Sequence, residues 1–248
     1  MDIGMILNLG WGPAALLLLA LPGLRSARNA PWLLLAIAIA VADSIATLLP
    51  LIYHPLLIPH TRFNWTGKLI DIAVMVTIML ALTASGLFKR ADFGFTFRQA
   101  PGTLRGLLLV AVPFLLIVAG LTMKFFGNTS PPKLETVLFE ATLPGLAEEL
   151  VWRGLLLALF DRMFAGRVTI LGAGLGYGAI ATSLVFGFVH SVQFDSKLML
   201  HTYWDNGAFA VATGLVLVWI RARTKSLVFP VLTHNATNLI LECVPLMR

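Results

Sequence analysis

Two adjacent carboxylates and a guanidinium interrupt an otherwise apolar run at residues 141–159. Glu149 and Arg153 are four residues apart with the acid first, which is the favourable order for an ion pair on one face of a helix. Glu148 points about 100° further round such a helix and cannot easily share that arginine. We therefore interpret Glu148 as a carboxylate without its own cation. The alternative is that both acids lie at a water-filled helix end or pair with a basic loop residue.

Imidazole and amide side chains occur on two later apolar segments. His190 ends the segment that contains Phe186, and His234 and Asn238 are four residues apart, so that they share a helix face. A carboxylate, two imidazoles and an amide can together activate a water molecule and stabilise an oxyanion. The ordinary alternative for a membrane histidine is a structural hydrogen bond between helices. Because three segments offer such groups, the sequence favours the chemical interpretation.

The composition indicates that helices within a membrane must position these groups. Of the 248 residues, 58% are hydrophobic and only 12% are charged, which is far more apolar than a soluble domain. Several runs reach the roughly 20 residues that span a bilayer as a helix, and the alternation of a transmembrane barrel is missing. We predict an all-α, polytopic transmembrane helix bundle with about eight spans. These spans are 4–23, 31–53, 67–88, 104–126, 134–162, 168–190, 204–221 and 226–246.

The polar motifs divide the chain into two predicted regions. Residues 1–133 would hold the N-terminal transmembrane helices, and residues 134–248 would form a protease-like core that contains all three motifs. Each region would contribute about four spans.

The motifs also carry a resemblance to a known family. They read EExxxR at Glu148 to Arg153, FxxxH at Phe186 to His190 and HxxxN at His234 to Asn238. In this order, on three late hydrophobic segments, they resemble the CAAX protease and bacteriocin-processing family of intramembrane proteases. This family is also called the Abi family and includes the Ras-converting CAAX endopeptidases. The resemblance covers residues 134–246 and implies peptide-bond hydrolysis by a glutamate-activated water.

Carried over motif by motif, the resemblance implies a role for each residue. Glu148 and His190 would activate the water, and His234 and Asn238 would contact the oxyanion. The supporting residues would be Glu149, Arg153 and Phe186. The substrate would be a membrane-associated or lipidated protein.

The chemistries of other membrane proteases match the sequence less well. The HExxH signature of zinc proteases is absent, and the string nearest to the rhomboid Gly-x-Ser-Gly motif, at residues 83–86, lacks the first glycine. We therefore expect no cofactor. A divalent metal such as zinc is the alternative, because Glu148, Glu149, His190 and His234 are all competent ligands. An ion pair between Glu149 and an arginine would use one of these ligands.

Two aspartates within predicted spans support a different function. Asp43 and Asp71 lack the GxGD string of intramembrane aspartyl proteases, and we interpret Asp43 as a hydrogen-bonded partner of another helix. In a proton- or ion-coupled transporter, these acids, Glu148 and the histidines would form an ion pathway. A non-catalytic scaffold of the same fold is a further alternative. The two halves share no visible repeat, which favours the protease.

The charge pattern indicates a membrane partner. The formal net charge is +6, but the basic residues are scattered as expected beside membrane helices, so we predict no nucleic-acid binding. The single cysteine, Cys243, excludes a disulfide within the chain and a cysteine zinc cluster. The expected partners are membrane lipids and a protein or peptide substrate at the membrane. We expect a multi-pass integral protein of a prokaryotic cytoplasmic membrane.

Overall fold

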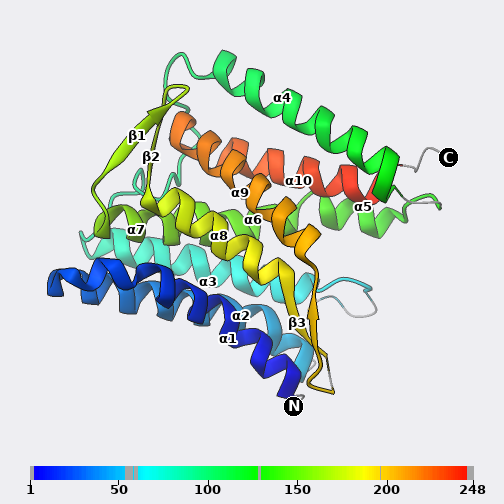
Figure 1. The fold of residues 1–248 in the computed structure, drawn as a ribbon, viewed down its shortest axis with the longest axis horizontal. Helices are drawn as coiled ribbons and strands as arrows, with labels where there is room; N and C mark the ends of the chain where they lie inside the picture. The colour runs from blue at the N-terminus through cyan, green and yellow to red at the C-terminus, as the bar shows by residue number, and fades with distance from the viewer. Residues whose placement is uncertain (1–2, 54–57, 59–60, 128–129, 196, 245–248) are drawn as a thin grey trace.

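A computed structural model describes residues 3–53, 58, 61–127, 130–195 and 197–244, and apolar helices dominate it (Figure 1). The helices are α1 (Ile3–Ala20), α2 (Ala30–Tyr53), α3 (Trp65–Ala84), α4 (Leu104–Leu121), α5 (Leu134–Glu140), α6 (Leu143–Glu149), α7 (Leu157–Met163), α8 (Tyr177–Ser191), α9 (Trp204–Thr224) and α10 (Val228–Cys243). Short 3₁₀ turns at Leu21–Arg25 and Ala27–Asn29 connect α1 to α2. The π-helical segments are η3 (Thr122–Phe126) and η4 (Leu150–Leu156). The predicted all-α class is confirmed.

Several helices have the length and apolar character of membrane spans. In the part of the chain that the structure describes, the four stretches that meet both criteria are Ala27–Pro50, Trp65–Ala84, Leu104–Phe125 and Trp204–Thr224. Shorter apolar helices lie at Gly12–Arg25 and Tyr177–Ser191. The transmembrane character is thus confirmed, whereas the number of eight spans stays a prediction. The last two residues of the predicted span 226–246 lie outside the described residues.

The prediction of one continuous span over residues 168–190 is wrong. Its first part forms a hairpin of strands β1 (Arg167–Ile170) and β2 (Ala173–Gly176), and α8 begins only at Tyr177. Leu171 and Gly172 connect the strands with φ angles of 49° and 79°, which is the left-handed conformation of a two-residue hairpin turn. A glycine-rich stretch thus forms a turn where the hydrophobicity predicted a helix. A second hairpin pairs β3 (Val192–Phe194) with β4 (Leu200–Thr202).

The prediction of a single helix over residues 134–162 needs a similar correction. The helix is interrupted at Ala141 and Thr142, between α5 and α6. Pro144 lies at the first turn of α6, where its missing N–H leaves no hydrogen bond unmade. From there α6, η4 and α7 follow one another without a break to Met163. The π-helical segment begins directly after the two predicted carboxylates, as π-bulges often do near functional groups.

The helices pack around this central α6–η4–α7 path. α1, α2 and α3 lie on one side of the molecule and α4, α5 and α10 on the opposite side, with α8 and α9 between them (Figure 1). α6 contacts both α3 and α10, and η4 contacts α2, α3, α8 and α9. The first and second halves of the chain therefore meet at the segment that carries EExxxR.

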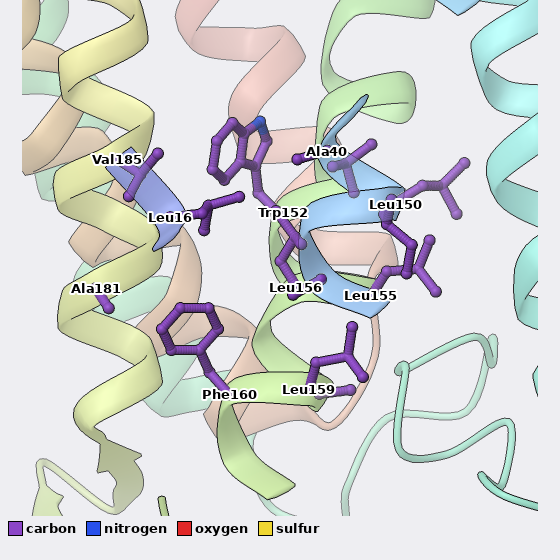
Figure 2. Close-up of a cluster of buried hydrophobic side chains, with 14 of the residues drawn as sticks. Leu16, Ala40, Leu150, Trp152, Leu155, Leu156, Leu159, Phe160, Ala181 and Val185 are labelled. Carbon is purple, nitrogen blue, oxygen red and sulfur yellow. The ribbon is translucent and has the colours of Figure 1, made fainter. Parts of the chain in front are cut away.

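The main hydrophobic core surrounds η4 and α7. Leu155, Leu156, Leu159 and Phe160 are fully buried, and they pack among Leu16 of α1 and residues of α2 and α8 (Figure 2). Almost every residue from 147 to 160 is buried. Charged groups on this path therefore need partners within the protein.

Candidate active site

The predicted ion pair on the central path is present. Arg153 Nη1 lies 2.7 Å from Glu149 Oε1, and their side chains are 1% and 0% exposed. The guanidinium also lies over the ring of Phe186, with its carbon atom 4.5 Å from the ring centroid. Gly214 of α9 leaves room for it, because a Cβ there would lie 3.1 Å from Arg153 Nη2. Helix packing therefore fixes this cation in one place.

His234 joins the same carboxylate from α10. Its Nδ1 lies 2.8 Å from Glu149 Oε1 and must donate, because a carboxylate has only acceptor atoms. This hydrogen bond places the other ring nitrogen on the side of Glu148, where Nε2 lies 3.8 Å from Glu148 Oε2. That distance is too long for a direct hydrogen bond and fits one bridging water. Glu149 thus orients the imidazole that faces Glu148.

His190 is oriented by its own helix. Its Nδ1 donates to the carbonyl oxygen of Phe186 at 2.6 Å, which leaves Nε2 free for other partners. His190 and Glu148 line one cavity of about 430 Å³, which is also walled by α1 and α2. These two predicted water-activating residues therefore share a space large enough to admit water.

Phe186 contacts most of the predicted site. Its ring centroid lies 4.4 Å from that of His190, 6.0 Å from that of His234 and 5.6 Å from that of Trp152. Phe186 is 2% exposed and also carries the stacked guanidinium of Arg153. The Phe186 ring therefore packs against both imidazoles and limits their rotation.

The interpretation of Glu148 as a carboxylate without its own cation is wrong. Lys68 Nζ of α3 lies 2.9 Å from Glu148 Oε1, and the side chains are 16% and 20% exposed. The spacing on one helix could not reveal this partner, because α3 and α6 are about 80 residues apart in sequence and meet only in the folded bundle. The signal that could have found it is the lysine itself, since a cation within an apolar span needs a partner.

Asn238 is not among the residues that line the cavity of Glu148 and His190. Its side chain lies near Glu140 of α5. Its neighbour Asn235 has a structural role that the sequence analysis missed. Asn235 Oδ1 accepts from Gly145 N at 2.8 Å, and Nδ2 donates to the carbonyl oxygens of Ala141 and Thr142. Asn235 therefore joins α10 to the interruption between α5 and α6.

The two aspartates of the sequence analysis lie on α2 and α3, near Lys68. Asp43 lines the cavity together with Lys68 and Glu148, and Asp71 is fully buried. Both have Lys68 as an electrostatic neighbour. The interpretation of Asp43 as a hydrogen-bonded partner of another helix stays a prediction. Within the described residues, no group of three or more His, Cys, Asp or Glu side chains has the arrangement of a metal site.

Comparison with known proteins identifies a family. The family model described as type II CAAX prenyl endopeptidase Rce1-like matches residues 105–240. This range is more than half of the chain and contains the EExxxR, FxxxH and HxxxN motifs, whereas Asp43, Lys68 and Asp71 lie outside it. No curated protein and no solved structure matches the chain.

Proposed function

The chain belongs to the type II CAAX prenyl endopeptidase Rce1-like family, and from this premise we propose that it hydrolyses a peptide bond of a membrane-associated or lipidated protein with a water activated by Glu148. The family is one of proteases, so the general reaction is hydrolysis. The glutamate mechanism, the substrate class and the absence of a cofactor are parts of the proposal.

Water activation is assigned to Glu148 and His190. Oε1 of Glu148 is bound to a lysine, so Oε2 is the oxygen that accepts a proton from water. Because Nδ1 carries the proton of the neutral His234 ring, Nε2 is an acceptor. A water between Oε2 and Nε2 would donate to both of them, which leaves its lone pairs for a substrate carbonyl. His190 Nε2 is a further acceptor in the same cavity.

Stabilisation of the oxyanion is assigned to His234 and Asn238. When both ring nitrogens of His234 are protonated, Nδ1–H is bound to Glu149 and Nε2–H is available to a developing oxyanion. Asn238 lies one helical turn from His234 on α10, and its amide N–H groups can donate to the oxyanion of a bound substrate. Glu149 and Arg153 act through His234 and do not contact the reacting atoms.

One observation carries the proposal: Glu148 faces His234 at 3.8 Å and shares a cavity with His190, inside a segment that matches a protease family. The transporter alternative uses the same acids, but the family match favours hydrolysis.

The experiment is cleavage by the purified protein in lipid vesicles. We expect the wild-type protein to release the C-terminal fragment of a prenylated peptide with a CAAX-type end, and a peptide without the prenyl group to be cleaved more slowly. Mass spectrometry of the fragments locates the cleaved bond. No fragment from either peptide, or from the membrane proteins of cells that make the chain, would contradict the proposal.

A further inference from the structure

The lysine that forms an ion pair with Glu148 lies outside the segment that matches the family model. Lys68 lies on α3, whereas the family match begins at residue 105. Both Lys68 and Glu148 line the cavity that contains His190. A residue of the N-terminal helices therefore touches the carboxylate to which water activation is assigned.

The start of α3 is anchored so that this lysine has a fixed position. Asn64 caps the helix by accepting from Gly67 N at 2.9 Å, and its amide donates to the carbonyl oxygen of Thr47 at 2.7 Å. Gly67 lets α3 approach α2, because a Cβ there would lie 2.4 Å from the same oxygen. Lys68 follows directly and is thus held close to α2.

Two further carboxyl groups, of Asp43 and Asp71, lie near the ammonium group. Asp71 is fully buried, and no donor of the described residues bonds its oxygens. Asp43 of α2 lines the same cavity as Lys68 and Glu148, and Asp71 follows Lys68 by three residues on α3. Acidic groups of α2, α3 and α6 therefore lie near this ammonium group.

We propose that Lys68 is a positioning residue for peptide hydrolysis: its ammonium group, 2.9 Å from Glu148 Oε1, fixes this oxygen and directs Oε2 towards His234. The inference rests on the proposed function. The hydrogen bond uses one carboxylate oxygen, and the other stays at 3.8 Å from His234 Nε2. The N-terminal helices thus complete a site whose motifs all lie in the second half of the chain.

The test replaces the lysine with one side chain that removes its charge and with another that keeps it. Lys68→Met keeps the length without the cation, and we expect kcat to fall about a hundredfold, the typical effect of misplacing a catalytic group by about 1 Å. KM should stay within about threefold, because the lysine is not assigned to substrate binding. Lys68→Arg keeps the charge, and its kcat should be at least about tenfold higher than that of Lys68→Met. Lys133→Met, at an exposed position, is the matched control and should behave as wild type.

The outcomes distinguish this inference from the proposed function. Wild-type kcat in Lys68→Met, or a fall in Lys68→Arg as large as in Lys68→Met, overturns the positioning role and leaves the protease assignment intact. If wild-type protein cleaves no peptide, the proposed function fails and this inference fails with it. Lys68→Gln, which keeps an N–H donor, is the second variant if Lys68→Met does not fold, and the same division between kcat and KM is expected.

Discussion

Single side chains show how the site is held together. One oxygen of Glu149 accepts from both Arg153 and His234, at 2.7 and 2.8 Å, in a fully buried position. The carboxylate therefore neutralises a buried cation and orients an imidazole at once. Buried pairs of this kind add little net stability, but removing one partner leaves an uncompensated charge.

Arg153→Ala should therefore destabilise the fold. It leaves Glu149 buried without its cation, and we expect a loss of about 3–5 kcal/mol in the free energy of unfolding. Thermal unfolding in detergent measures the change. Arg105→Ala, on an exposed face of α4, is the control and should unfold like wild type. An unchanged melting temperature for Arg153→Ala would show that the pair has no structural role.

Asn238→Ala tests the oxyanion assignment. Removing one oxyanion donor typically lowers kcat by about 10²–10³, so a measurable activity should remain. Glu140→Gln removes the charge of its neighbour on α5 and should change kcat by less than about tenfold, since Glu140 is not assigned to the reaction. Equal losses in the two variants would instead assign Asn238 to holding α5 against α10.

At the scale of the elements, glycines bring α8 and α9 close together. A Cβ at Gly187 would lie 2.7 Å from the carbonyl oxygen of Gly207, and a Cβ at Gly207 would meet the Ser191 side chain. α8 carries Phe186 and His190, so this crossing also sets where the FxxxH residues lie relative to η4. Small residues often allow such close approach of membrane helices.

Gly187→Ala should separate these helices. The backbone oxygen cannot move aside as a flexible side chain can, so we expect a loss of about 1–3 kcal/mol in stability and reduced cleavage. Gly120→Ala, in α4 with no atom within 4 Å of a new Cβ, is the matched control and should be neutral or slightly stabilising. A Gly187→Ala protein as stable as wild type would contradict the close crossing.

The sequence predicted best those features that depend on the spacing of residues within a single helix. The Glu149–Arg153 pair and the turn from Phe186 to His190 depend only on helical periodicity, and both are present. Hydrophobicity alone could not predict the β1–β2 hairpin, because an apolar stretch rich in glycine is compatible with a helix or with a turn. The interruption at Ala141 depends on Asn235 of α10, which is a contact between distant segments.

For the whole molecule, the site lies where the two halves of the chain meet. α3 and α6 bring Lys68 to Glu148, and the cavity has walls from α1 and α2 as well as α8. Which helices become neighbours depends on packing throughout the bundle, so the sequence motifs could predict three of the contributing segments but not α1, α2 and α3. The same packing decides whether the acids are available to a metal.

Chelation should leave cleavage intact. The ammonium of Lys68 and the guanidinium of Arg153 already bind the carboxylates of Glu148 and Glu149 at 2.9 and 2.7 Å. Fewer carboxylate oxygens are therefore left to bind a divalent cation. After prolonged treatment with a strong chelator, kcat should stay within about twofold of the untreated value, because a general base needs no metal. Loss of activity that zinc restores would assign Glu148 and the histidines as ligands.

The central claim is that Glu148 takes the proton from the attacking water. The most direct measurement is the rate of peptide cleavage by Glu148→Gln in lipid vesicles, beside wild type and Asp205→Asn, which makes the same carboxylate-to-amide change at an exposed position. The amide keeps the size of the side chain and an acceptor for Lys68 but is not a base, so kcat should fall by at least about 10²–10⁴ while the melting temperature stays near that of wild type. Asp205→Asn should cleave normally. Undiminished cleavage by a folded Glu148→Gln protein would contradict the account.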